Sequence, residues 1–335
     1  MTNPVVVEVL RGGRVESEHR GAGAVVEACG RVVFSFGDIE RPVYPRSAVK
    51  ALQALPLVES GAADRLGFNE AELALAVSSH SGEGEHVALA LGMLAKANLS
   101  EPALCCGAHW PLGAEATRSL AAQWQSPSQL HNNCSGKHAG FLCLAVNEGW
   151  SATGYVEPDH PVQRAVKAAL EETTGETLDE SRRAVDGCSI PTYAIPLRCL
   201  AQAFARFGSG EGFSPSRAAA ARRIRDAVRA HPFLVAGTGR FDTEFMTLFG
   251  AKTFTKTGAE GVFCAALPDV GLGLAVKADD GAGRAAEALI AALIVRFAGF
   301  DAAEKALAAK FVRPTLNNWR GIEVGQIRPA GPLGD

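Results

Sequence analysis

The sequence predicts an α+β protein in which antiparallel strands from both chain ends form one sheet and a helical lobe is inserted between them. Strand-like segments occupy about the first 40 residues and return after residue 250, whereas helix-like segments fill the middle. Because strands and helices are segregated along the chain, a βαβ winding is excluded. We expect a sheet lobe over residues 1–44 and 251–300, a helical lobe over 45–250 and a C-terminal tail over 301–335, together making one functional unit.

Glycine pairs and β-branched residues define the N-terminal strands. Residues 5–10 are rich in valine and end at Gly12-Gly13, and residues 23–28 and 31–36 follow, separated by Cys29-Gly30. Alternating β-branched runs bounded by glycines are typical of hairpins. The segment is therefore predicted to be an antiparallel meander.

The middle of the chain carries the spacing of amphipathic helices. Apolar residues at Val49, Leu52 and Leu55 predict a helix over 47–59, and Asn69-x-x-Glu72 has the pattern of a capping box. Further helices are predicted at residues 71–77, 85–99, 135–147, 161–171, 199–207 and 217–230. The arginines of the last of these spread around the helix, which indicates a solvated face rather than a nucleic-acid contact.

Strand signals return near the C-terminus. Residues 252–257, 261–267 and 272–278 are predicted strands, the last of them after the turn Pro268-Asp269-Val270-Gly271. A long apolar helix is predicted over 284–300. These strands complete the sheet begun at the N-terminus.

The composition excludes several classes of protein. With 47% apolar and 21% charged residues and a net charge of −3, the chain is a globular protein that has no global attraction to nucleic acid or anionic lipid. Its longest apolar run falls short of the roughly 18 residues of a membrane span, and its N-terminus lacks the basic region of a signal peptide. We therefore expect a cytoplasmic protein without a nucleic-acid or membrane partner. Eight cysteines in 335 residues do not make a disulfide scaffold.

Ser47 and Lys50 are the first candidates for chemistry. Their i, i+3 spacing at a predicted helix start places a hydroxyl and an amine one turn apart. A serine needs a base to attack a carbonyl, and a desolvated lysine can be that base. The pattern alone equally fits an N-cap serine beside a solvated lysine.

Two further segments carry polar groups in comparable contexts. Lys256-Thr257-Gly258 ends a predicted strand, where its amine and its edge N–H groups could face a site, although such a triplet is usually a plain turn. Ser78-Ser79-His80-Ser81-Gly82 joins two predicted helices and could relay a proton, or could be a simple connection. The order of the three motifs along the chain is that of the serine β-lactamases and penicillin-binding proteins. We expect their site at the junction of sheet and helical lobe.

Thiols and a carboxylate form a candidate metal site. Cys134, Lys137 and His138 share one face at a helix start, and Asp186 and Cys188 lie in a turn further along. Two thiols and a nitrogen ligand suit zinc, but the spacing is not that of a zinc finger, and buried structural thiols remain the alternative.

The sequence resembles the asparaginase II family, the rhizobial-type (class 3) L-asparaginases, from about residue 5 to residue 300. The resemblance is carried by Gly37-Asp38-x-x-Arg41-Pro42-x-Tyr44-Pro45-Arg46-Ser47-x-x-Lys50, Ser78-Ser79-His80-Ser81-Gly82-Glu83, His131-Asn132-Asn133-Cys134-Ser135-Gly136-Lys137-His138, Asp186-Gly187-Cys188, Ala236-Gly237-Thr238-Gly239-Arg240 and Lys256-x-Gly258-Ala259-Glu260-Gly261.

The resemblance implies a serine β-lactamase/glutaminase-like fold and the hydrolysis of L-asparagine to L-aspartate and ammonia. It further implies two Ser-Lys pairs, a metal site beside them that holds one zinc ion not strictly required for the nucleophilic step, and a homodimer. The implied catalytic residues are Ser47, Lys50, Ser79 and Lys256, the implied substrate contacts are Arg46, His80 and Asp186, and the implied zinc ligands are Cys134, Lys137 and Cys188.

Two alternatives stay open at this point. A glutaminase or a penicillin-interactive serine hydrolase would share both lysine motifs, and a non-catalytic zinc-binding protein could retain the same fold. Measuring ammonia release from asparagine and from glutamine, together with nitrocefin turnover, distinguishes an asparaginase from a glutaminase and from a penicillin-interactive hydrolase. A covalent adduct on Ser47 excludes the non-catalytic protein.

Overall fold

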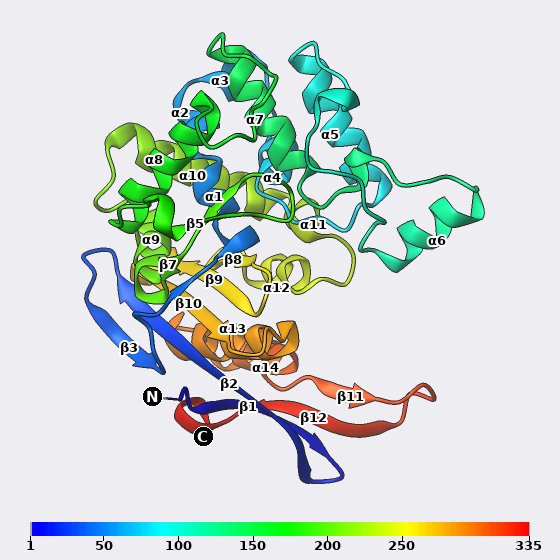
Figure 1. The fold of residues 1–335 in the computed structure, drawn as a ribbon. Coiled ribbons are helices and arrows are strands. Elements are labelled where there is room, and N and C mark those ends of the chain that lie inside the picture. Colours follow the sequence, from blue (N-terminus) through cyan, green and yellow to red (C-terminus); the bar gives the residue numbers. More distant parts are fainter. Residues whose placement is uncertain (1, 335) are drawn as a thin grey trace. The chain divides into compact units, whose positions relative to one another are not determined.

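The computed structural model describes residues 2–334, which divide into two compact units. The sheet unit contains the residues up to 48, residues 195–212 and the residues from 251 onward, and the helical unit contains residues 49–194 and 213–250. Figure 1 shows the elements of both units. The sheet unit differs from the predicted sheet lobe because it includes the segment 195–212 and the tail.

The sheet unit is built on one antiparallel sheet whose strands come from both chain ends. Its main path runs β11-β12-β1-β2-β10-β9-β8, and β3 pairs with β2 at the side. The bounds are β1 Val5–Arg11, β2 Arg14–Glu27, β3 Val32–Phe36, β8 Phe254–Thr257, β9 Val262–Leu267, β10 Leu272–Ala278, β11 Thr315–Asn317 and β12 Glu323–Pro329. The predicted α+β class and the pairing of N-terminal with C-terminal strands are confirmed.

The tail contributes to the sheet in a way that the sequence did not predict. After helix α14 (Ala302–Val312), β12 pairs with β1 from Val7–Pro329 to Arg11–Gly325. Strand β11 has only three residues, and β12 contains a glycine and a proline, so local β-propensity is weak. Their structure depends on the partner strand from the other end of the chain.

Helices cover both faces of the sheet within this unit. Helix α9 (Leu197–Ser209) packs on β2, β9 and β10, and α13 (Gly283–Phe297) lies against β9 and β10 from the other side (Figure 1). A Cβ atom on Gly273 would lie 2.0 Å from the carbonyl oxygen of Ala201, so glycine is required where α9 approaches β10.

The helical unit surrounds α7, whose residues 135–145 are all buried. The other helices are α1 Lys50–Gln53, α2 Leu55–Glu59, α3 Ala62–Arg65, α4 Glu70–Ala76, α5 Gly84–Lys96, α6 Ala114–Ala122, α8 Pro161–Thr174, α10 Pro215–Ala230, α11 Pro232–Ala236 and α12 Phe241–Phe249. The capping box at Asn69 and Glu72 is confirmed, with both reciprocal hydrogen bonds present. A short hairpin of β5 (Arg183–Val185) and β6 (Pro191–Tyr193) completes the unit.

The single helix predicted over residues 47–59 is wrong in detail. A 3-10 turn, η1 (Arg46–Val49), leads into α1, and α2 follows after a break at Ala54. Pro56 near the start of α2 cannot donate the hydrogen bond that a continuous helix needs, which explains the break. None of the helices within residues 2–334 has the combination of length and apolarity that crossing a membrane requires.

Candidate active site

The segment around Ser47 has a strained backbone. Arg46, directly before the serine, has φ +52°, a left-handed conformation that a residue with a Cβ rarely adopts. Ser47 lies in the same 3-10 turn, η1, and is partly exposed, and Lys50 is the first residue of α1. Such strain persists where the surroundings enforce it, and it is concentrated at functional sites.

Strand β8 brings a second motif beside this turn within the sheet unit. Lys256, near the end of β8, is fully buried, and its Nζ donates to the carbonyl oxygen of Thr257 at 3.1 Å. A Cβ on Gly258 would lie 2.7 Å from the carbonyl oxygen of Pro45, so glycine allows the strand end to approach the segment that precedes Ser47. The N–H of Gly258 itself is engaged by the carbonyl of Val262 at 2.8 Å, so it is not a free oxyanion donor.

Lys50 is a buried amine held by backbone carbonyls of the helical unit. Its side chain is almost completely buried, and Nζ lies 2.5 Å from the carbonyl oxygen of Ser78 and 3.2 Å from that of Asn133. Burial lowers the pKa of Lys50 and outweighs the opposing influence of the Cys134 thiol. This is the direction that favours a lysine acting as a base.

The loop that follows α4 is held against α11 by hydrogen bonds. The N–H of Ser79 donates to the carbonyl of Val235 at 2.8 Å, and Ser81 Oγ donates to that of Ala236 at 2.8 Å. Asn133 Nδ2 lies 3.4 Å from Ser79 Oγ. The backbone of Ser79 is therefore held by Val235, and its hydroxyl accepts a hydrogen bond from the amide of Asn133.

Glu83 ties the same loop to the glycine-rich segment after α11. Its carboxylate accepts from the N–H of Thr238 at 2.8 Å and from Thr238 Oγ1 at 2.7 Å. Gly237, directly before Thr238, has φ +109°, and a Cβ on Gly237 would lie 2.4 Å from Glu83 Oε1. The carboxylate at the end of the 78–83 motif and the Gly-Thr-Gly segment therefore form one contact, which the sequence did not reveal.

His80 is fully buried, and both of its ring nitrogens have protein partners. Nδ1 accepts from the N–H of Gly82 at 3.1 Å, so Nε2 carries the proton that is shared with Ser135 Oγ at 2.9 Å. Burial lowers the pKa of His80, which keeps the ring neutral. The ring thereby links the Ser79 loop to the start of α7.

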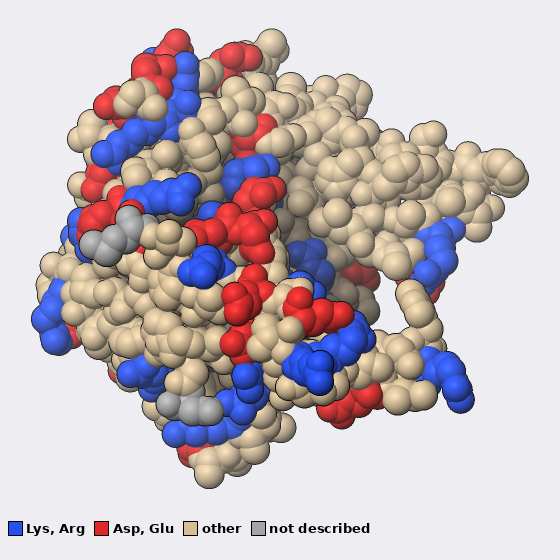
Figure 2. Space-filling view, turned by 60° about the horizontal axis from the view of Figure 1, so that its bottom comes forward, with Lys and Arg blue, Asp and Glu red and all other residues tan. Residues whose placement is uncertain are grey.

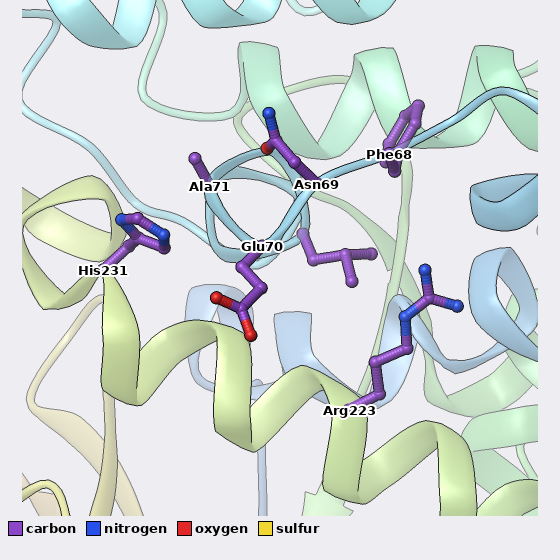
Figure 3. A pocket seen from close by; sticks show the side chains of 7 residues that line it. Phe68, Asn69, Glu70, Ala71, Arg223 and His231 are labelled. Atoms are coloured by element: carbon purple, nitrogen blue, oxygen red, sulfur yellow. The ribbon is translucent and has the colours of Figure 1, made fainter.

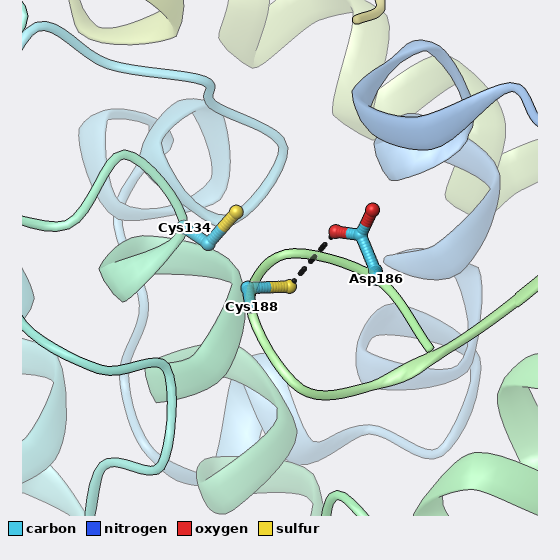
Figure 4. A group of neighbouring side chains, drawn as sticks. All are labelled: Cys134, Asp186 and Cys188. Atoms are coloured by element: carbon cyan, nitrogen blue, oxygen red, sulfur yellow. Dashed lines mark hydrogen bonds between the residues drawn. The ribbon is translucent and has the colours of Figure 1, made fainter. Parts of the chain in front are cut away.

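Two cysteines and an aspartate converge in the helical unit. One ligand atom each of Cys134, Asp186 and Cys188 lies within 4.8 Å of the other two (Figure 4). Cys188 Sγ is 3.1 Å from Asp186 Oδ2, and Lys137 Nζ is 3.0 Å from Cys188 Sγ. The structure thus brings together the residues for which a metal site was expected.

Local structure explains this convergence. Cys134 lies at the N-cap of α7, and a Cβ on Gly136 would lie 2.4 Å from the carbonyl oxygen of Leu75, so glycine allows α7 to pack closely on α4. Cys188 lies in the tight turn between β5 and β6, closed by the bond from the N–H of Asp186 to the carbonyl of Ile190. In that turn Ser189 has φ +77°, a second strained residue beside a candidate site residue.

The charges around the two thiols complement one another. A hydrogen bond from Cys188 lowers the pKa of Cys134, and the cations Lys137 and Lys50 lower it further. The same contact, together with burial, raises the pKa of Cys188. Burial would lower the pKa of Lys137, but the adjacent Cys134, Cys188 and Asp186 outweigh it and raise that pKa. These directions favour a thiolate at Cys134 and an ammonium at Lys137.

The donor set fits a soft divalent cation. Thiolates favour zinc over magnesium or calcium, and Cys134, Cys188 and Lys137 supply two sulfurs and a nitrogen, with the Asp186 carboxylate in reach. To bind a metal, Lys137 must lose its proton, which a cation at the thiolates promotes. The other six cysteines lie elsewhere, and Cys29 and Cys105 are exposed.

One pair of residues beside this cluster was missed by sequence reasoning. His138 Nδ1 lies 2.6 Å from the hydroxyl of Tyr155, which also accepts the N–H of Cys105 at 2.9 Å. His138 was noted on the face of Cys134, but Tyr155 lies in a turn segment without a motif, so only the fold could associate the two. His138 Nε2 is buried and has no hydrogen-bond partner within residues 2–334.

The expected site residues thus form two groups. Arg46, Ser47 and Lys256 belong to the sheet unit, and the others belong to the helical unit: Lys50, Ser79, His80, Cys134, Lys137, Asp186 and Cys188. The chain itself joins the groups, because only two residues separate Ser47 from Lys50.

Comparison with known proteins identifies the family. A family model described as L-asparaginase II matches residues 7–329. The chain belongs to this family. Membership supports amidohydrolase activity on asparagine in general and confirms the resemblance found in the sequence.

Among solved structures, this L-asparaginase II family member is similar to a β-lactamase from Mycobacterium bovis, with 15% identity, a TM-score of 0.39 and coverage of 84% of this chain and 95% of the other. It is also similar to a structure titled Mglu, with 16% identity, a TM-score of 0.35 and coverage of 80% and 64%. A putative β-lactamase from Bacteroides dorei matches with 16% identity, a TM-score of 0.34 and coverage of 77% and 84%. The search of curated proteins found no match.

Proposed function

We propose that this protein hydrolyses L-asparagine to L-aspartate and ammonia through a Ser-Lys nucleophile. Membership of the L-asparaginase II family supports the substrate class. The observation that carries the proposal is Lys50, a buried amine with a lowered pKa that contacts the backbone of Ser78 and lies one turn after the strained Arg46-Ser47 segment. The lowered pKa is the direction that suits Lys50 to accept a proton from Ser47.

In the proposed first step, Lys50 Nζ takes the proton of Ser47 Oγ, and the oxygen attacks the side-chain amide carbon of asparagine. The C–O bond forms while the carbonyl π electrons move to the amide oxygen. Ser79 and Lys256 then pass a proton to the amide nitrogen, the oxyanion electrons re-form the carbonyl as the C–N bond breaks, and ammonia leaves a β-aspartyl ester on Ser47. Water then gives a proton back to Ser79 and Lys256 as its oxygen attacks the ester carbon, the bond from that carbon to Ser47 Oγ breaks, Lys50 returns its proton to Ser47 Oγ, and L-aspartate leaves.

The substrate contacts remain predictions for Arg46, His80 and Asp186. Arg46 is partly exposed beside Ser47, and its guanidinium is suited to a carboxylate. Asp186 adjoins both thiols and is suited to an ammonium group. Both ring nitrogens of His80 already bond to the protein, so its contribution is expected through the position of Ser79.

Zinc is proposed as the bound ion, held by Cys134, Lys137 and Cys188, with one ion per chain. When bound, zinc supplies a Lewis acid that orients the α-amino or carboxylate group of the substrate. The nucleophilic step is expected to proceed through Ser47 and Lys50, so zinc is not strictly required for it. A homodimer is proposed from the family resemblance, and the cytoplasmic location stays a prediction from the sequence.

The test measures ammonia release from L-asparagine by wild type and by Ser47→Ala. Release from asparagine that is lost in Ser47→Ala supports the proposal. Greater turnover of glutamine, or turnover of nitrocefin, would instead assign one of the two alternative hydrolase functions. A wild-type protein that turns over none of the three substrates and forms no adduct on Ser47 with a reactive amide analogue would be a non-catalytic binding protein.

A further inference from the structure

A cavity of about 460 Å³ lies in the helical unit between α4 and the C-terminal end of α10. Figure 3 shows Glu70 of α4 between Arg223 on α10 and His231 at the end of that helix. Phe68 and Leu73 are buried and supply apolar wall, and Asn69 and Ala71 complete the lining. The volume lies within the range of small-molecule sites, which combine apolar walls with a few polar groups.

The polar side chains of this cavity have hydrogen-bonding groups that are available to a ligand. Within the described residues, neither the carboxylate of Glu70 nor the ring of His231 has a hydrogen-bond partner. Arg223 uses only Nη1, which lies 2.7 Å from Asp64 Oδ1, so the other N–H groups of its guanidinium remain available. The cavity therefore offers an acceptor for a cation, a donor array for a carboxylate and an apolar surface.

Two elements lead from this cavity to the same loop. Helix α4 begins at Glu70 and ends at Ala76, directly before the loop that carries Ser79. Helix α11 begins right after His231, and its carbonyls at Val235 and Ala236 accept the hydrogen bonds of that loop. A molecule that bridges the starts of α4 and α11 thus contacts both supports of the loop.

We propose that this cavity binds a neutral α-amino acid with an apolar side chain, whose ammonium group pairs with Glu70 and whose carboxylate pairs with Arg223. A zwitterion is the ligand class that uses the carboxylate and the guanidinium together, and an apolar side chain matches Phe68 and Leu73. Bound ligand joins the start of α4 to α10, the helix that leads through His231 into α11, and thereby stabilises the loop of Ser79. The site is separate from the proposed catalytic residues, and binding to it does not depend on the proposed function.

Isothermal titration calorimetry with L-leucine as the probe tests the binding site in the absence of asparagine. We expect titration of wild type with L-leucine at concentrations of up to ~20 mM to show binding. Glu70→Gln and Arg223→Gln should each raise the Kd for L-leucine about fivefold, the factor expected for the loss of one solvent-accessible charged contact. N-acetyl-L-leucine lacks the ammonium group and L-leucinamide lacks the carboxylate, so both should bind less well. Arg222→Gln, at an exposed neighbouring position outside the lining, is the matched control and should bind as wild type does.

Binding that is unchanged in both Glu70→Gln and Arg223→Gln would place L-leucine elsewhere and overturn the proposal, as would the absence of binding to wild type. Hydrogen exchange at residues 78–81 tests the link to the loop. Slower exchange of the Ser79 amide with L-leucine in wild type, but not in Glu70→Gln, supports the link, and unchanged exchange in both overturns it. Neither measurement uses turnover, so the result is independent of whether the protein hydrolyses asparagine.

Discussion

Lys50 Nζ donates a hydrogen bond to the carbonyl oxygen of Ser78, with the two atoms 2.5 Å apart. The contact connects the two candidate Ser-Lys motifs, because Lys50 follows Ser47 by one turn and Ser78 directly precedes Ser79. A second bond to the carbonyl of Asn133 connects the same amine to the turn that carries Cys134. One buried amine therefore contacts backbone from both neighbouring motifs of the proposed site.

The first prediction concerns the nucleophile and its base. Ser47→Ala and Lys50→Met should each lower kcat for asparagine by at least about 10³-fold, because the two groups act as one unit. Ser47→Ala should keep the melting curve of wild type. Lys50→Met should also lose about 1–3 kcal/mol of stability, because two buried carbonyls lose their donor.

Lys50→Arg separates base catalysis from simple charge. Arginine keeps a cation but cannot serve as the base, so its kcat should be no higher than that of Lys50→Met. Steady-state ammonia release measures both variants. Recovery of activity by arginine would mean that Lys50 acts electrostatically and that another group, such as Lys256, is the base.

The second prediction concerns the metal. Wild type purified without chelator should contain about one zinc per chain by mass spectrometry of the metal content, and Cys188→Ala should contain far less, because one of two thiolates is lost. Cys105→Ser, an exposed cysteine outside the cluster, is the matched control. Removing zinc should raise KM more than it lowers kcat.

Two results would contradict this metal assignment. Wild type that holds no zinc and gains none on titration excludes the site. If chelation abolishes kcat at saturating asparagine, zinc takes part in the chemistry and the serine mechanism is incomplete.

The third prediction concerns the contact between Glu83 and Thr238. Glu83→Ala removes the acceptor of two hydrogen bonds, at 2.8 and 2.7 Å, and with it the link between Thr238 and the Ser79 loop. We expect kcat to fall about tenfold or more with little change in zinc content. Glu83→Gln, which keeps an acceptor oxygen, should retain most of the activity.

Glu85→Ala is the control for this position, because Glu85 is exposed two residues further along the chain. It should match wild type in kcat and in melting temperature. Equal activity of Glu83→Ala and wild type would show that the contact does not position Ser79.

The fourth prediction concerns acid stability. The rings of His80 and His86 stack with centroids 4.9 Å apart, and burial lowers the pKa of both below the usual value. Below pH ~6.5 these histidines bind protons in the unfolded chain but not in the folded protein. The free energy of unfolding therefore falls as the pH falls, by up to about 1.4 kcal/mol per pH unit for each histidine. Above that pH the contribution is fully present.

Urea unfolding between about pH 7.5 and pH 5 measures this slope. His86→Gln should be less stable than wild type at pH 7.5 but lose stability less steeply toward pH 5. His231→Gln, at a partly exposed histidine far along the chain from His80 and His86, should keep the slope of wild type. An unchanged slope in His86→Gln would exclude this ring as a source of the acid sensitivity.

The sequence by itself determined the elements whose signals are local. The predicted bounds 135–147 and 272–278 match α7 and β10, because apolar periodicity and flanking turn residues act over a few positions. The family motifs also identified Cys134 and Cys188 as neighbours, and the structure brings them together. Local patterns thus suffice for these two elements and for the α+β class, and the family motifs supply the residue types of the candidate site.

Only the tertiary structure decided the contacts between distant segments. The pairing of β12 with β1, the bond from Lys50 to Ser78 and the contact of Glu83 with Thr238 join residues whose own sequences carry no signal for one another. The cavity beside Glu70 and Arg223 likewise exists only because α4 and α10 pack together. Such contacts depend on close packing, where a glycine such as Gly136 admits a neighbouring backbone, and short-range periodicity contains no record of that geometry.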